Sequence, residues 1–94
     1  MQAYMEHSPR SREVSDKFKA LSHPHRLDIV QSLMGAPANV SALQAMLGIP
    51  QPSVSAHLAR LRSAGIIEGI RQGQEIRYRL VDEDTRTLIT AVMQ

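Results

Sequence analysis

The chain has 94 residues, of which 43% are apolar and three are aromatic, and it carries a net charge of +2 and no cysteine. This length fits one small domain with a modest core, which a second copy of the chain often completes. The absence of cysteine excludes disulfide bonds, thiolate metal ligands and a thiol-based redox sensor. There is no signal-peptide pattern and no apolar run near about 18 residues, so we expect a soluble, cytoplasmic protein.

The charged residues are unevenly distributed. Residues 50–80 contain five arginines and two glutamates, whereas residues 81–94 contain three acidic residues and one arginine. Nine of the eleven basic residues are arginine, whose planar guanidinium group pairs with phosphate oxygens and with base edges. A nucleic-acid partner and an ordinary scatter of surface charge explain this distribution equally well.

The beginning of the chain predicts an arm and a helix. Residues 1–7 show no periodicity, so we expect a loose arm there and a single domain over 8–94. The first helix starts at Ser8 or Ser11 and ends near Leu21. Its apolar residues, spaced four and three apart, are Val14, Phe18 and Leu21.

A second helix is predicted directly after the first. It starts at Pro24, with His23 as a possible cap, and Gly35 and Pro37 end it. Its apolar positions are Leu27, Ile29, Val30, Leu33 and Met34.

Two short helices joined by a tight turn come next. Ser41 is the predicted cap of the first of them, and Gly48 ends it. Its inward residues are expected to be Leu43, Met46 and Leu47. The second covers 51–62 and starts near Pro52, with an apolar stripe at i, i+3, i+4 and i+7. The residues of this stripe are Val54, His57, Leu58 and Leu61. The pair predicts a helix-turn-helix.

After Gly65 the period changes to two, which predicts a hairpin. A strand over 66–70, a turn over 71–74 and a return strand over 75–80 are expected. On the return strand the inward residues are Ile76, Tyr78 and Leu80, and the outward residues are Glu75, Arg77 and Arg79. Asp82 then caps a last helix, whose apolar side is Leu88, Ile89 and Val92. The predicted fold is α+β, mainly α: a winged helix-turn-helix with about five helices and a two-stranded β-hairpin wing.

Three blocks of the sequence resemble one protein family. They are ALSHPHRLDIVQSL at 20–33, QPSVSAHLARLRSAGII at 51–67 and GQEIRYRL at 73–80. In this order they are similar to the ArsR/SmtB-type bacterial transcriptional repressors. The resemblance implies a homodimeric repressor that binds a palindromic DNA operator. The family usually has a serine cap where this chain has Pro50, and because proline offers no capping side chain we expect an altered conformation of Gln51.

We expect the helix at 51–62 to enter the major groove, because the side opposite its apolar stripe carries small residues. The wing at 66–80 is expected to contact the DNA backbone. The candidate DNA-binding residues are Gln51, Ser53, Ser55, Ala56, Arg60, Arg71, Gln72 and Arg77. Arg79 lies nearer the base of the wing and pairs with acids in an alternative arrangement. A surface of small residues that binds nothing is the other interpretation.

No known metal site of the resembling repressors is present. The thiolate site at the start of the third helix corresponds to Asn39-Val40-Ser41, which offers no such ligand. The zinc site on the last helix requires histidines, and residues 81–94 contain none. We therefore predict no metal ion and no cofactor, and the inducing signal stays open.

Four histidines remain to be explained. His57 lies on the inward stripe and is expected to be a packed core residue, and His23 is expected to be a helix cap. An unusual metal site that combines His23 and His25 with His7 or Glu6 is the alternative interpretation.

The apolar faces of the first and last helices predict a homodimer. The candidate interface residues are Val14, Phe18, Leu21, Leu88, Ile89 and Val92. Simple closure of the monomer core is the other explanation for these residues.

The sequence leaves one alternative class of function open and argues against another. A winged-helix protein-interaction module without direct DNA binding is the main alternative. An enzyme is not expected, because Ser53 and His57 stand at i, i+4 without a third group that would orient them.

Overall fold

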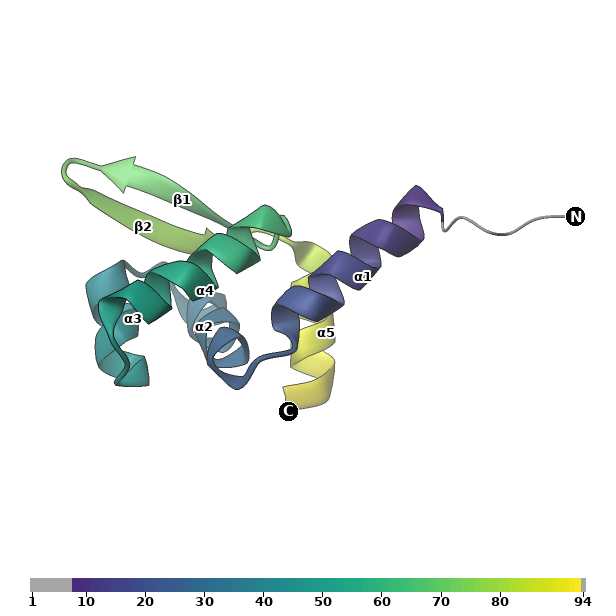
Figure 1. Ribbon diagram of the computed structural model, residues 1–94, viewed down its shortest axis with the longest axis horizontal. Helices are drawn as coiled ribbons and strands as arrows, with labels where there is room; N and C mark the ends of the chain where they lie inside the picture. The colour runs from purple at the N-terminus through teal and green to yellow at the C-terminus, as the bar shows by residue number, and fades with distance from the viewer. Residues whose placement is uncertain (1–7, 94) are drawn as a thin grey trace, which may run out of the picture.

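The structure is a computed structural model that describes residues 8–93, and the arm predicted at 1–7 lies outside the described residues (Figure 1). In this described part of the chain, five helices and one two-stranded antiparallel sheet follow one another in the predicted order. The elements are α1 (Pro9–Leu21), α2 (Pro24–Gly35), α3 (Val40–Leu47), α4 (Gln51–Ser63), β1 (Ile67–Gln72), β2 (Glu75–Leu80) and α5 (Glu83–Met93). The predicted winged helix-turn-helix architecture is confirmed. Within residues 8–93, no helix has the length and hydropathy that a membrane crossing requires.

Local side-chain bonds set the beginnings of the first two helices. The hydroxyl group of Ser8 accepts a hydrogen bond from the backbone N–H of Ser11 (3.0 Å), and Pro9 follows at the first helical position. The Nδ1 atom of His23 accepts from the backbone N–H of His25 (3.1 Å), so the predicted histidine cap is confirmed. Each cap satisfies a donor that the first helical turn leaves unpaired.

The predicted cap of α3 is wrong by two residues. Asn39, and not Ser41, accepts from the backbone N–H of Ala42 (2.8 Å), so the helix begins at Val40. The amide group of Asn39 also donates to both carboxylate oxygens of Glu75 on β2 (3.2 Å each). This contact with a distant strand holds Asn39 in the capping position.

One core joins the helices to the base of the wing. Its buried apolar residues are Ala20, Leu21, Ile29, Val30, Leu33, Leu43, Val54, Leu58, Leu61, Ile66, Ile67, Tyr78, Leu80 and Ile89. On α3, Leu43 is buried as predicted, but Met46 is 47% exposed and so does not face inward. The short helix α3 therefore packs against α2 and α4 through buried Leu43 and half-buried Val40 and Leu47.

The wing has a shorter turn than the sequence predicted. Arg71 pairs with Ile76 and Gln72 pairs with Glu75, so the first two of the four predicted turn residues belong to β1. The turn is reduced to Gly73-Gln74, and Gly73 has the positive φ of 68° that glycine adopts without strain. The predicted alternation of β2 is confirmed, with Tyr78 and Leu80 buried and Arg77 and Arg79 exposed.

Two backbone hydrogen bonds fix the wing to the helices. The N–H of Ala38 donates to the carbonyl oxygen of Tyr78 (3.0 Å), and the N–H of Tyr78 donates to that of Ala38 (2.8 Å). Ala38 lies in the segment between α2 and α3, so this bridge ties β2 to the helix-turn-helix.

An ion pair joins the first and last helices. The Nζ atom of Lys17 on α1 lies 2.8 Å from Oδ1 of Asp82, and both side chains are largely buried. The other carboxylate oxygen of Asp82 accepts from the backbone N–H (3.1 Å) and the hydroxyl group (2.6 Å) of Thr85, which confirms Asp82 as the cap of α5. One carboxylate thus starts α5 and attaches it to α1.

We predict that Asp82→Ala lowers the free energy of unfolding by about 2–3 kcal/mol, because it removes a helix cap and leaves the Lys17 ammonium group without its closest partner. Glu83→Ala is the matched control: its side chain is 84% exposed, so a change within about 0.5 kcal/mol is expected. Urea unfolding at one fixed protein concentration measures the stability of both variants. Equal stability of the two would contradict the role of Asp82 as the cap of α5 and the partner of Lys17.

The carboxyl group of Asp82 also makes the stability of the protein depend on pH. Burial by itself raises the pKa of Asp82, but the hydrogen bonds from Lys17 and Thr85 together outweigh it and hold the pKa below its ordinary value. A carboxylate with a lowered folded-state pKa stabilises the protein above its unfolded pKa of about 3.9, and this contribution is lost as the pH falls through the folded-state value. Between neutral pH and about pH 3, the wild type should therefore lose more stability than Asp82→Ala. Urea titrations at the two pH values measure both losses. An equal loss of stability in the wild type and in Asp82→Ala would refute this role of Asp82.

Candidate nucleic-acid interface

The helix α4 is buried along one face and open along the other. Val54, Leu58 and Leu61 are at most 2% exposed and pack into the core. Of the candidate residues on this helix, Gln51, Ser55, Ala56 and Arg60 are exposed and Ser53 is half-buried. The helix therefore presents a surface of mostly small side chains to solvent, as the sequence predicted.

The beginning of α4 has no side-chain cap. Pro50 occupies the capping position, and its carbonyl oxygen accepts from the backbone N–H groups of Ser53 (3.0 Å) and Val54 (3.2 Å). The positive end of the helix dipole consequently faces solvent beside Gln51, with no acidic residue in the first turn. Such an end attracts phosphate groups.

The wing arginines differ in how tightly the protein holds them. The Nε atom of Arg79 donates to Glu68 at 2.7 Å, which agrees with the alternative that Arg79 pairs with an acid. The Nε atom of Arg77 lies 3.9 Å from Glu75, and Arg71 makes one 3.3 Å hydrogen bond to the carbonyl oxygen of Gly73. Arg71 and Arg77 are exposed and weakly held, so they are the two wing arginines that are most available to a partner.

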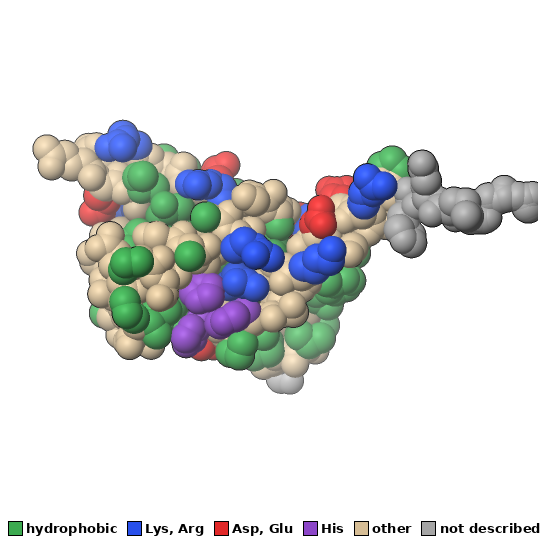
Figure 2. Space-filling view, viewed as in Figure 1, with side chains coloured by type: hydrophobic (Ala, Val, Ile, Leu, Met, Phe, Trp, Pro, Cys, Tyr) green, Lys and Arg blue, Asp and Glu red, His purple; other side chains and the backbone are tan. Residues whose placement is uncertain are grey.

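Basic side chains gather on the face that carries α4 and the wing. Figure 2 shows lysine and arginine side chains spread from the wing towards α1, with histidines beside them. Burial and then the positive charge of Arg60 lower the pKa of Arg26, so the cationic side chains of Arg26 on α2 and Arg60 on α4 lie near each other. The positive electrostatic potential of this face favours an anionic partner.

The expectation that His57 is a packed core residue is wrong. His57 is half-buried and lies against His23, with ring centroids 4.5 Å apart, and its Nδ1 atom lies 3.2 Å from Nη1 of Arg26. Burial and then the charges of His23, Arg26 and His25 lower the pKa of His57. Nothing local in the sequence indicated these neighbours of His57, because they come from the start of another helix.

The candidate interface residues of α1 and α5 lie on one side of the domain. Phe18 and Val92 are 54% and 62% exposed, whereas Leu21 and Ile89 are buried in the monomer core. The two residues that complete this set, Val14 and Leu88, are half-buried. The sequence prediction did not include Met93 of α5, which is 46% exposed.

A helix-turn-helix followed by a basic two-stranded wing defines the class of this protein, a winged helix-turn-helix transcriptional regulator. The family described as "Bacterial regulatory protein, arsR family" matches residues 23–68. The chain is 39% identical over 83 residues to the biofilm growth-associated repressor of Xylella fastidiosa strain Temecula1, across 88% of this chain and 73% of that relative. The chain therefore belongs to the arsR family of bacterial regulatory proteins.

Two solved structures agree with this assignment. The crystal structure of the transcriptional repressor BigR from Xylella fastidiosa superposes with a TM-score of 0.81 at 38% identity, over 88% of this chain and 85% of that one. The solution structure of the homodimeric winged helix-turn-helix DNA-binding domain Mb0332 from Mycobacterium bovis gives a TM-score of 0.82 at 30% identity, over 96% and 87%.

Proposed function

We propose that this protein binds operator DNA as a symmetric homodimer and represses transcription from the promoter it occupies. The observation that carries this proposal is the exposed small-residue face of α4 beside two weakly held wing arginines. The similarity to a biofilm growth-associated repressor, to BigR and to a homodimeric DNA-binding domain supports it.

The helix α4 reads the bases in this proposal. Its N-terminal half enters the major groove, where a Gln51 amide pairs with adenine and the methyl group of Ala56 contacts thymine. Ser53 and Ser55 bind base edges or phosphate oxygens. Arg60, one turn further along, binds phosphate.

The wing contributes affinity more than sequence specificity. Arg71 and Gln72 at the end of β1, and Arg77 on the exposed face of β2, contact the backbone or the minor groove. These contacts neutralise phosphates and release counterions, which makes the affinity depend on salt.

The second copy of the chain packs against α1 and α5. Val14, Phe18, Leu88 and Val92 supply the apolar surface of this interface. Leu21 and Ile89 support it from beneath, because they are already buried within one chain. Two-fold symmetry then requires a palindromic operator with half-sites about one or two helical turns apart.

The experiment that tests the function is a fluorescence-anisotropy titration against duplex DNA from the promoter of the protein's own gene and against a scrambled duplex, each at two salt concentrations. We expect tight, promoter-preferring and salt-dependent binding. Equal weak binding to both duplexes would favour the alternative, a winged-helix module that binds proteins.

Removing one wing arginine should change the salt dependence. Arg77→Gln should weaken binding to promoter and scrambled DNA alike and lower the slope of log K against log salt by about one, because one phosphate contact is lost. Arg12→Gln removes the same charge from α1 and should leave the slope unchanged. An unchanged slope for Arg77→Gln would exclude Arg77 from the interface.

A charge on the apolar face should separate the two copies. Phe18→Glu buries an unpaired carboxylate at the proposed interface, so we expect the molar mass from light scattering to fall from that of a dimer to 10.4 kDa. Met46→Glu places the same charge on a similarly exposed apolar residue of α3 and should stay dimeric. A Phe18→Glu protein that remains dimeric would show that α1 is not in the interface.

A further inference from the structure

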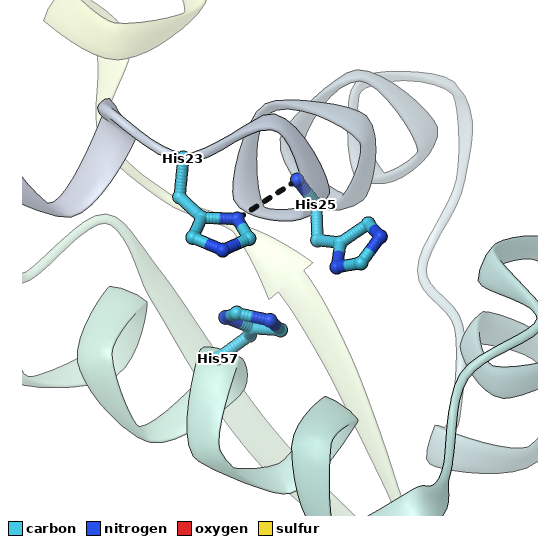
Figure 3. A group of neighbouring side chains, drawn as sticks. All are labelled: His23, His25 and His57. Atoms are coloured by element: carbon cyan, nitrogen blue, oxygen red, sulfur yellow. Dashed lines mark hydrogen bonds between the residues drawn. The ribbon is translucent and has the colours of Figure 1, made fainter.

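Three histidines from two distant parts of the chain converge beside α4 (Figure 3). His23 caps α2, His25 lies in the first turn of α2, and His57 lies on α4. One ring nitrogen from each side chain lies within 4.8 Å of the other two, and the ring centroids are 4.5 to 5.6 Å apart. All three residues are half-buried.

We propose that His23, His25 and His57 bind one divalent transition-metal ion, for which Zn²⁺ is the reference. Imidazole nitrogen is a preferred ligand of Zn²⁺, Cu²⁺ and Ni²⁺, and three histidines with a water molecule make a common four-coordinate set. Nitrogens bound tetrahedrally to one ion at about 2.1 Å lie about 3.4 Å apart. Ring movements of about 1 Å bring the three nitrogens to that spacing.

The ring of His25 is available to a metal ion. A histidine binds a metal through the lone pair of its neutral form. The ring of His25 makes no hydrogen bond within residues 8–93, so both of its nitrogens are available.

Two existing hydrogen bonds oppose binding. Nδ1 of His23 accepts from the backbone N–H of His25, and Nδ1 of His57 faces Nη1 of Arg26. A neutral imidazole that binds a metal through one nitrogen carries its proton on the other, so neither Nδ1 can go on accepting. Each lost bond costs about fivefold in affinity, and we expect weaker binding than at a site whose ligands are already free.

The proposed site is separate from the two places at which the resembling repressors bind metal ions. At the start of α3 this chain has Asn39-Val40-Ser41, which offers no thiolate ligand, and residues 81–94 contain no histidine. It spans the start of α2 and the middle of α4. An ion held there joins α4 to α2 through coordinate bonds as well as through apolar contacts.

Isothermal titration of the full chain, without a polyhistidine tag, with Zn²⁺ at neutral pH tests the proposal. We expect one ion per chain for the wild type. His25→Gln and His57→Gln should each weaken binding at least about tenfold, and so should His23→Asn, which keeps a capping side chain while removing the imidazole. His7→Gln is the matched control, because His7 is the only other histidine, and it should bind as the wild type does.

Circular dichroism and thermal unfolding, with and without Zn²⁺, check that each variant is folded. The ion should raise the unfolding midpoint of the wild type and of His7→Gln, but not that of His25→Gln, whose lost ring makes no hydrogen bond in the described chain. Absence of Zn²⁺ binding by the wild type, or wild-type affinity in His25→Gln and His57→Gln, would overturn the proposal. A loss in His7→Gln as large as that in His57→Gln would also overturn it.

Discussion

The burial of one face of α4 is the constraint on which the other features depend. Val54, Leu58 and Leu61 lose nearly all contact with water, and burial of each such side chain contributes about 1.5–3 kcal/mol. These residues fix the rotation of the helix about its own axis, so the opposite face, from Gln51 to Arg60, is held towards solvent. Because α4 also contacts α1, α2, α3 and β1, four other elements hold this exposed surface in place.

Two polar connections then place the remaining surfaces relative to α4. The backbone bridge between Ala38 and Tyr78 holds the wing beside the helix-turn-helix, so the wing keeps a fixed position relative to α4 (Figure 1). The ion pair between Lys17 and Asp82 holds α5 against α1 and keeps their apolar residues together. A domain of this size can therefore offer separate surfaces to DNA and to a second copy of itself.

Local patterns in the sequence predicted the helices and strands. They did not predict the distant contacts that decide which of two possible residues caps a helix or where a turn begins. The change from helical period to period two located α4 and the wing, because each period reflects burial of one face. Asn39 and Ser41 are both acceptable caps, and only the distant carboxylate of Glu75 favours Asn39. The predicted turn of the wing began two residues too early. The register of the two strands, which the sequence does not encode locally, decides that Arg71 is paired with a residue of β2. The neighbours of His57 come from another helix, so periodicity alone indicated a core residue.

Together, α4 and the wing form the proposed DNA-binding surface. Amide chemical shifts of the ¹⁵N-labelled protein, recorded while promoter DNA is added, show directly which residues the DNA contacts. We expect the largest changes on residues 51–60 and on the wing, with small changes on the outer face of α5. Changes confined to α1 and α5, or spread evenly over the domain, would contradict this proposal.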